Sequence, residues 1–215
     1  MSLFLIILLI LLAYLIGSIP SAVWIGKIFY GIDVRQHGSG NAGATNVIRT
    51  LGYKAGIPVL IFDVLKGWVA VQVIFLFPYA GLTNDYLTYI RIGMAFAAVL
   101  GHVFPVLAGF KGGKGVGTLA GTAIALYPLA LLIVLVIFIL TLLLTRYVSL
   151  ASILGGISFP FIVIFITGQD HPGLVLLAII VAIFIPLTHL KNIKRLVKGE
   201  ENKFDFRKNK PEGNS

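Results

Sequence analysis

Long apolar runs with almost no charged residues dominate this chain of 215 residues. Charged residues make up only 12% of the sequence, against about 25% in soluble domains. Most runs are long enough for a helix that crosses a hydrocarbon core of about 30 Å, because a helix rises about 1.5 Å per residue. The sequence therefore predicts an all-α integral membrane protein. The runs cover approximately residues 3–25, 56–77, 89–107, 116–145, 150–167 and 173–190.

The number of crossings depends on the run 116–145, because one straight helix of that length would measure about 45 Å. Tyr127-Pro128 lies inside it. Proline interrupts helical hydrogen bonding and tyrosine favours the membrane interface, so the run forms either one long helix or two short ones. Two helices give seven crossings and place nearly all Lys and Arg on one face, as the positive-inside rule requires. We therefore expect a bundle of seven transmembrane helices, with the N-terminus outside and the C-terminus cytoplasmic, in which the piece 116–126 tilts or lies inside the bundle.

Composition also limits the domain organisation and the chemistry. We expect one transmembrane domain over residues 1–198 and a loosely ordered, polar cytoplasmic tail over 199–215. The N-terminal run lacks the basic start of a signal peptide, so we interpret it as the first membrane helix. The absence of Cys excludes thiolate chemistry, and the four His show no metal-ligand spacing, so we expect no metal and no cofactor. The net charge of +9 is better explained by orientation in the membrane than by nucleic-acid binding.

A first glycine-rich polar segment reads Gly-Ser-Gly-Asn-Ala-Gly from Gly38. A dinucleotide-binding fold would need a preceding strand, which membrane helices exclude. A short helix over 44–50 could instead present its N-terminus to an anion. The alternative, a flexible loop with a helix cap at Asn41 or Thr45, explains only one or two of the polar residues. The candidate phosphate-binding or catalytic residues are Gly38, Ser39, Gly40, Asn41, Asn46 and Arg49.

A second segment, Phe110–Gly117, contains two lysines among four glycines. It is not a Walker A loop, since Gly115 follows Lys114 where Ser or Thr would be required. The alternative is a flexible turn whose lysines only obey the positive-inside rule. Backbone N–H groups between glycines can form an anion-binding nest, and a helix starting near Val116 would add its dipole. The candidate residues here are Lys111, Gly112, Gly113, Lys114 and Gly115.

Other polar residues lie within or at the ends of the apolar runs. His189 and Asn192 are three residues apart at the cytoplasmic end of the last run, where they could transfer a proton and orient a substrate. Asp63 and Lys66 have the spacing of a structural ion pair inside a membrane helix. The remaining supporting candidates are His102, which could bond a carbonyl of the second glycine loop, and Glu200, which could pair with Arg49 or a loop lysine.

Taken in order, these residues resemble the bacterial membrane acyl-phosphate:glycerol-3-phosphate acyltransferases. The resemblance covers about residues 10–205, and only Gly117 departs from the alanine expected there. Each motif alone is weak, whereas the ordered set is specific. The motifs are Gly17-Ser18-Ile19-Pro20-Ser21, Gly26-Lys27, Gly38 through Asn46 with Arg49, Asp63 with Lys66-Gly67, Gly101-His102, Phe104-Pro105, Phe110 through Gly115, and His189, Asn192, Arg195, Gly199 and Glu200.

The resemblance implies an enzyme of phospholipid synthesis in the bacterial plasma membrane, with seven helices and an active site facing the cytoplasm. It implies transfer of a long-chain acyl group from acyl phosphate to the sn-1 hydroxyl of glycerol 3-phosphate. Lysophosphatidic acid and phosphate are the implied products, and neither coenzyme A nor acyl carrier protein is the donor. The implied partners are these two substrates and membrane lipid, with the soluble enzyme that makes the acyl phosphate as a further candidate and no nucleic acid.

The residues suggest a mechanism without an acyl-enzyme, because the chain lacks Cys and a Gly-x-Ser-x-Gly elbow. Acyl phosphate is already activated, so positioning and charge stabilisation suffice. The glycerol hydroxyl would attack the acyl carbonyl directly and lose its proton either to His189 or to a phosphate oxygen of the donor. The competing function is a small transporter of an anionic metabolite, since glycine-rich broken helices also bind substrates there. Transporter sites lie near the midplane, whereas these motifs gather at one face.

Overall fold

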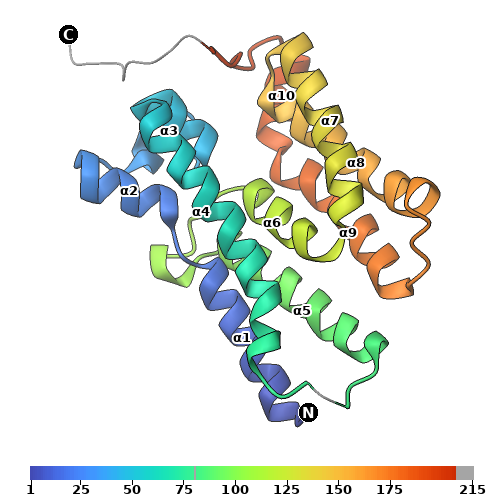
Figure 1. The fold of residues 1–215 in the computed structure, drawn as a ribbon. Coiled ribbons are helices and arrows are strands. Elements are labelled where there is room, and N and C mark those ends of the chain that lie inside the picture. The colour runs from blue at the N-terminus through green and yellow to red at the C-terminus, as the bar shows by residue number, and fades with distance from the viewer. Residues whose placement is uncertain (80, 207–215) are drawn as a thin grey trace. The chain divides into compact units, whose positions relative to one another are not determined.

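The computed structural model describes residues 1–79 and 81–206, and all regular elements in these ranges are helical. The helices divide into two compact units, residues 1–125 and residues 126–206, which we describe separately (Figure 1). Residues 207–215, part of the predicted tail, lie outside the described residues. The predicted all-α membrane fold is thus confirmed at the level of its secondary structure.

In the first unit, α1, α4 and α5 pack around a common apolar core. Leu9 and Ala13 from α1 meet Ala70 from α4 and Met94 from α5 in this core. Pro20 separates α1 from α2, because a proline at this position cannot donate the hydrogen bond that would continue the helix. The helices of this unit are α1 (Leu3–Gly17), α2 (Ser21–Tyr30), α3 (Ala44–Leu51), α4 (Tyr53–Gln72), α5 (Asn84–Val103) and α6 (Val116–Leu126), with short turns at η1 (Val34–Gln36), η2 (Val73–Leu76) and η3 (Val106–Ala108).

The short helix α6 lies directly against α4. A side chain at Gly121 would collide with the Val64 carbonyl, and one at Gly67 would collide with the Thr118 carbonyl. Small residues let two membrane helices approach until their backbones touch. This contact fixes where α6 begins, and therefore where the second glycine loop ends.

The second unit contains α7 (Pro128–Thr145), α8 (Val148–Phe161), the π-helical turn η4 (Ile162–Ile166), α9 (Pro172–Thr188) and α10 (Leu190–Val197). The predicted break at Tyr127-Pro128 is confirmed, since α6 ends at Leu126 and α7 begins at Pro128. The expected position of Tyr127 at the membrane interface stays a prediction. Tyr127 is buried and its hydroxyl donates to the Leu174 carbonyl at 2.7 Å. This hydrogen bond satisfies the buried hydroxyl within the fold.

Five helical segments are long and apolar enough to cross a membrane, within the described ranges. The pair α9 and α10, bent by 60°, would make a sixth. The piece 116–126 forms a helix of only 11 residues, as its predicted shortness required. The fold is thus an all-helical integral membrane protein with five or six candidate spans. The spans are Leu3–Tyr30, Tyr53–Leu76, Asn84–Ala108, Pro128–Thr145 and Val148–Ile166.

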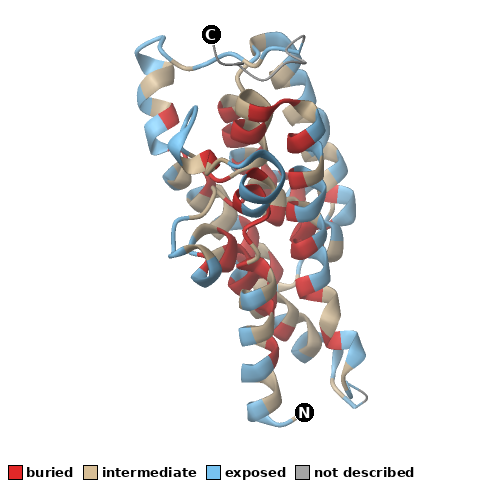
Figure 2. Ribbon diagram, turned by 90° about the vertical axis from the view of Figure 1, so that its left-hand side faces the viewer, coloured by how far each residue is buried: buried red, intermediate tan, exposed pale blue. Residues whose placement is uncertain are grey.

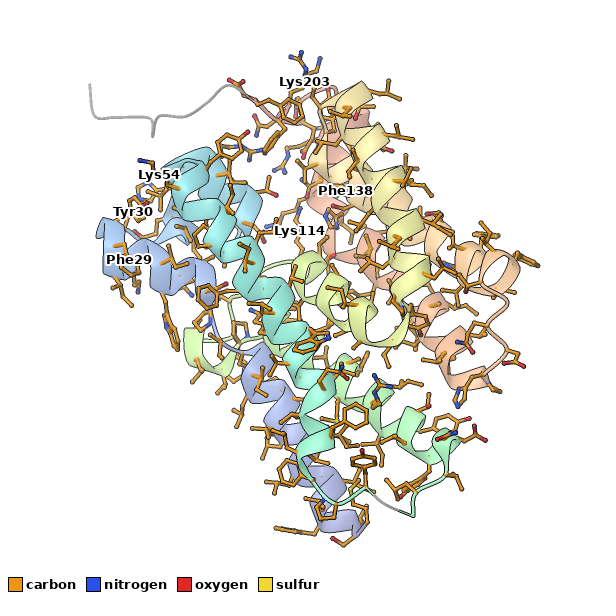
Figure 3. All side chains as sticks on the ribbon, viewed as in Figure 1. Phe29, Tyr30, Lys54, Lys114, Phe138 and Lys203 are labelled. Atoms are coloured by element: carbon orange, nitrogen blue, oxygen red, sulfur yellow. The ribbon has the colours of Figure 1, made fainter. Side chains whose placement is uncertain are left out.

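Many residues of the helices are exposed (Figure 2), and large apolar side chains are among them, which matches this interpretation. Along α7 Ala130 is the buried residue, while Leu132 is 61% exposed and Leu144 is 84% exposed. Apolar side chains, among them that of Phe138, surround α7 (Figure 3). An apolar helix with so much exposed surface needs lipid as its solvent.

The described part of the tail is more ordered than predicted. The Glu201 carboxylate accepts hydrogen bonds from side chains of α8 and α10, and the Phe204 amide donates to the Arg146 carbonyl at 2.6 Å. The segment 199–206 is polar in composition, but the carboxylate of Glu201 within it has specific partners in the fold. These contacts hold the segment against the second unit.

Candidate active site

The first glycine loop is shaped by Asn46 in the first turn of α3. Its amide nitrogen donates to the carbonyls of Val34 and His37, at 2.8 and 3.1 Å. Its amide oxygen accepts from the backbone N–H and the hydroxyl of Ser39, at 2.8 and 3.1 Å. These bonds use both donors and both acceptor positions of the buried amide. They favour a loop-shaping role for Asn46 over the direct phosphate binding that the sequence predicts.

Ser39 lies on the exposed rim of this loop. Its hydroxyl bond to Asn46 measures 3.1 Å, which is long for an O–H donor. The hydroxyl can therefore turn toward a ligand at small cost. The predicted helix over 44–50 is confirmed as α3, and its N-cap is Gly43 without a side-chain cap. The capping role considered for Asn41 or Thr45 is thus not observed. Arg49 lies in the last turn of α3 and is partly buried.

The second glycine loop is tied to the end of α5 through its backbone. The amides of Gly112 and Gly113 donate to the carbonyls of Val103 and His102, both at 3.2 Å. A side chain at Gly113 would collide with the His102 ring and approach the Ala42 carbonyl, so this glycine also adjoins the first loop. Lys111 is exposed, and Lys114 is partly buried just before α6 (Figure 3). The structure thus brings the two predicted loops together within the first unit.

A buried polar network lies beneath the second loop. The Asp63 carboxylate accepts from the Ser21 hydroxyl at 2.7 Å and pairs with the Lys66 ammonium at 2.8 Å, which confirms the predicted ion pair. The Lys66 ammonium also donates to the Ile19 carbonyl at 2.8 Å. Charges in a membrane helix are costly, and this mutual pairing lowers the cost. The network joins α4 to the break between α1 and α2.

His102 connects this network to the loop and to α6. Its Nδ1 lies 3.0 Å from the Thr118 hydroxyl and 3.5 Å from the Asp63 carboxylate. Its other ring nitrogen, Nε2, lies against Gly113 of the second loop, so the expected bond from the ring to a loop carbonyl stays a prediction. The backbone carbonyl of His102 also contacts the loop. An adjacent cavity of ≈ 10 Å³, lined by Ser21, Lys66 and His102 among others, has room for about one water molecule and is too small for a substrate.

In the second unit, His189 lies between α9 and α10. Its Nδ1 is 2.8 Å from the Ile185 carbonyl, which can only accept, so Nδ1 carries a proton and donates. The other ring nitrogen of the neutral form is then an acceptor. This is the tautomer that a general base requires. Asn192 is buried in the first turn of α10, on the same short segment as His189.

Glu201 organises this end of the second unit. Its carboxylate accepts from Asn192 at 2.6 Å, from Ser149 at 2.8 Å and from Arg195 at 2.7 Å. Burial raises the pKa of Glu201, but the hydrogen bonds from Arg195, Asn192 and Ser149 outweigh burial and lower the pKa overall. The sequence predicts the supporting role for the neighbouring Glu200, which is exposed. Glu201 is therefore the acidic residue with the supporting position, and only the turn after α10 reveals which of the two adjacent glutamates points inward.

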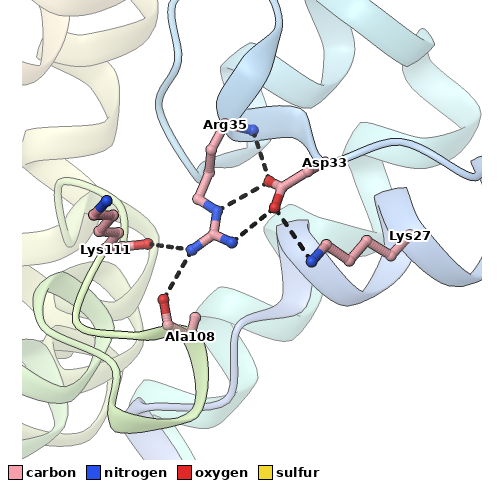
Figure 4. Close-up of polar contacts among 5 residues, drawn as sticks. All are labelled: Lys27, Asp33, Arg35, Ala108 and Lys111. Atoms are coloured by element: carbon pink, nitrogen blue, oxygen red, sulfur yellow. Dashed lines mark hydrogen bonds and ion pairs between the residues drawn. The ribbon is translucent and has the colours of Figure 1, made fainter.

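Asp33 and Arg35 are functional candidates that the sequence did not predict; Arg35 counted there only as one of the basic loop residues. The Asp33 carboxylate binds the Arg35 side chain, and the guanidinium reaches the second glycine loop (Figure 4). The hydrogen bonds from Arg35 hold the pKa of Asp33 well below its usual range. The signal in the sequence was an Asp and an Arg two positions apart directly before the glycines. Within residues 1–79 and 81–206, no three His, Asp or Glu side chains gather as a metal site would require.

Comparisons with known proteins identify the family to which this chain belongs. Residues 7–199 match the model of the glycerol-3-phosphate acyltransferase family. A glycerol-3-phosphate acyltransferase of Listeria monocytogenes is 48% identical over 200 residues, which are 93% of this chain and 97% of the relative. That of Chlorobium phaeobacteroides is 43% identical over 222 residues, covering 91% of this chain and 94% of the relative.

Solved structures show the same fold. PlsY, an integral membrane glycerol 3-phosphate acyltransferase, has been solved in a glycerol 3-phosphate form that superposes with a TM-score of 0.83 at 38% identity. That comparison covers 93% of this chain and 96% of PlsY. A lysophosphatidic acid form gives a TM-score of 0.80. This chain therefore belongs to the glycerol-3-phosphate acyltransferase family, and the resemblance drawn from its motifs is confirmed.

The chain is accordingly an acyltransferase of phospholipid synthesis that acts on glycerol 3-phosphate. This finding removes the small-transporter alternative. The roles of the individual loop residues are a separate question, because sequence and fold similarity do not assign them.

Proposed function

We propose that the enzyme uses a long-chain acyl phosphate as donor and releases lysophosphatidic acid and phosphate. The observation that carries this proposal is the pair of adjoining glycine loops in the first unit, with Ser39 and Lys114 on the loops and Arg49 on α3, the helix that follows the first loop. Both substrates bear phosphate groups, and loops of this kind supply N–H donors and positive charge to such groups. An acyl phosphate needs no covalent intermediate, which fits a chain without Cys.

The proposed roles follow the chemistry of each side chain. Arg49 and Lys114 bind one phosphate, with Ser39, Asn41 and backbone N–H groups of Gly38, Gly40, Gly112, Gly113 and Gly115 as further candidates. His189, Asn192 and Lys111 seat the second ligand. The glycerol hydroxyl attacks the acyl carbonyl, and its proton leaves to His189 or to a donor phosphate oxygen. Hydrogen bonding of His189 Nδ1 to Ile185 supports the first route, because it leaves the other ring nitrogen as an acceptor.

We also propose a seven-crossing topology in the bacterial plasma membrane, with α6 as the additional short crossing. The N-terminus then lies outside, and the glycine loops and basic tail face the cytoplasm. The charge distribution supports this arrangement, because the tail from Lys191 to Lys210 and both glycine loops are rich in Lys and Arg.

Steady-state kinetics of single variants test the site. Arg49→Ala and Lys114→Ala should each lower kcat/KM about 100-fold or more, because each removes a charged donor from a developing phosphate charge. Lys54→Gln removes an exposed charge from the start of α4 and should keep wild-type activity. Wild-type kinetics for folded Arg49→Ala and Lys114→Ala would refute the phosphate-binding role of the loops.

The pH–rate profile tests the base. If His189 accepts the proton, His189→Gln should remove the acidic limb of kcat, since that limb reports the protonation of the base. An unchanged profile in the variant would assign the proton to the donor phosphate oxygen.

A further inference from the structure

The two glycine loops are also connected by the side chain of Arg35, a residue to which the proposed mechanism gives no role. Arg35 belongs to η1, just before the first loop, and its Nη1 donates to the Ala108 carbonyl at 2.8 Å and to the Lys111 carbonyl at 3.4 Å (Figure 4). These carbonyls lie on either side of Gly109-Phe110. One guanidinium group thus holds both ends of the turn that leads into Lys111 and Lys114.

Asp33 fixes the orientation of this guanidinium group. Its carboxylate accepts from Arg35 Nε at 2.9 Å and from Nη2 at 2.7 Å, and its Oδ1 also accepts the Arg35 backbone N–H at 3.1 Å. Only the remaining nitrogen, Nη1, points to the second loop. The Lys27 ammonium lies 3.3 Å from the same carboxylate but is largely exposed. A bidentate pair of this kind sets geometry as well as charge.

The turn that Arg35 holds has an unfavourable backbone conformation. Gly109 and Phe110 both have positive φ angles, 63° and 59°. Glycine adopts this region freely, whereas a bulky residue such as Phe does so only when surrounding contacts impose it. The bonds from Arg35 on either side of Phe110, and the bond from the Phe110 amide to the Pro105 carbonyl at 2.8 Å, are such contacts.

We propose that Asp33 and Arg35 form a clamp that positions the Lys114 loop against the first glycine loop, so that Arg35 is a positioning residue for acyl transfer. The clamp rests on the proposed role of Lys114, because Arg35 acts through the loop that carries it. Arg35 itself need not touch the substrate. Its positive charge is already paired with Asp33, whereas its geometry defines where Lys111 and the residues after it lie.

Arg35→Lys separates geometry from charge. The variant keeps a positive charge, but one ammonium group cannot bind Asp33 in two places and reach both carbonyls. We expect Arg35→Lys and Arg35→Gln to lower kcat/KM for glycerol 3-phosphate to a similar degree, about 10- to 100-fold, since small misplacements of binding groups have effects of that size. Asp33→Asn should give a smaller loss, and Lys54→Gln serves as the exposed-charge control. Wild-type kinetics for Arg35→Lys would overturn the clamp.

A double-mutant cycle with Lys114→Gln tests whether the clamp acts through Lys114. If it does, adding Arg35→Lys to Lys114→Gln should cost much less than adding it to the wild type, because the positioned group is already absent. Full additivity of the two losses would overturn the proposal and assign Arg35 an independent effect. Wild-type activity of Lys114→Gln itself would refute both the proposed site and the clamp, whereas an impaired Lys114→Gln beside a normal Arg35→Lys would refute the clamp alone.

Hydrogen exchange provides a readout that does not depend on activity. The amides of Gly112 and Gly113 are hydrogen-bonded in the wild-type fold, so they should be protected. In detergent-purified Arg35→Lys, we expect faster exchange in the peptide that spans 106–115 and unchanged exchange in α1 and α5. Unchanged protection in 106–115 would overturn the clamp, even if the variant had lost activity for another reason.

Discussion

At the level of single residues, the shape of the site depends on a few buried polar groups with specific partners. Glu201 is an example, because its carboxylate binds Ser149, Asn192 and Arg195 at once. Asn46 is another, since its amide fixes the first glycine loop from inside. Such groups shape the site without contacting the substrate, and removing one leaves several partners unsatisfied.

Glu201→Ala should therefore destabilise the protein by about 1–3 kcal/mol and impair activity, because the buried Ser149 and Asn192 and the partly buried Arg195 lose their acceptor. Glu200→Ala is the matched control, since Glu200 is exposed and its side chain lacks these hydrogen bonds. Thermal unfolding in detergent checks the first effect, and initial rates check the second. Equal effects of the two substitutions would contradict the assignment of Glu201.

Acid should destabilise the fold through Asp33 and Glu201. Both carboxyl groups have a lower pKa in the folded protein than in the unfolded chain. Their contribution is complete above the ordinary carboxyl pKa and disappears as the pH falls from that range through the folded values. The melting temperature should thus decrease when the pH is lowered beneath about 4.5. In Asp33→Asn that acid dependence should be shallower, and an identical dependence would exclude Asp33 as a source.

Gly113→Ala tests the contact between the loops and His102. The added methyl group would collide with the His102 ring and approach the Ala42 carbonyl, so the loop must move. We expect a destabilisation of about 1–3 kcal/mol and a clear loss of kcat/KM. Gly93→Ala is the control for a generic glycine effect, because a side chain there would make only an ordinary contact with Ile10 at 3.5 Å. Wild-type stability and wild-type kcat/KM in Gly113→Ala would show that the loop tolerates displacement.

At the scale of elements, the sequence predicts what local chemistry determines. Pro128 marks the start of α7, the polar residues before Ala44 mark the start of α3, and the spacing of Asp63 and Lys66 predicts their ion pair. The clamp could not be predicted in this way, because Arg35 and Ala108 are 73 residues apart. Likewise, Tyr127 looks interfacial in the sequence, and only the packing of α9 supplies its buried partner at Leu174.

Close packing of α4 and α6 gives an element-scale prediction. Gly121→Val would force the two helices apart, because a side chain there collides with the Val64 carbonyl. We expect a loss of about 1–3 kcal/mol in stability, together with reduced activity, since α6 carries the end of the Lys114 loop. Val116→Ala, at the partly buried start of α6, is the control. Detergent thermostability and initial rates decide the outcome.

At the scale of the whole molecule, the topology and the reaction are the central questions. The chain has no Cys, so single cysteines can be introduced without background. With seven crossings, a cysteine at Ser2 should react with a membrane-impermeant maleimide in intact cells, whereas one at Lys203 should react only after lysis. The same accessibility at both positions would contradict an odd number of crossings.

The most direct test of the account is acyl transfer by the purified protein in detergent, with palmitoyl phosphate and palmitoyl-CoA supplied in parallel to glycerol 3-phosphate. We expect lysophosphatidic acid from palmitoyl phosphate alone, and strong losses of this activity in Arg49→Ala and Lys114→Ala. Product from palmitoyl-CoA but not from palmitoyl phosphate, in folded protein, would contradict the proposed donor and the mechanism built on it.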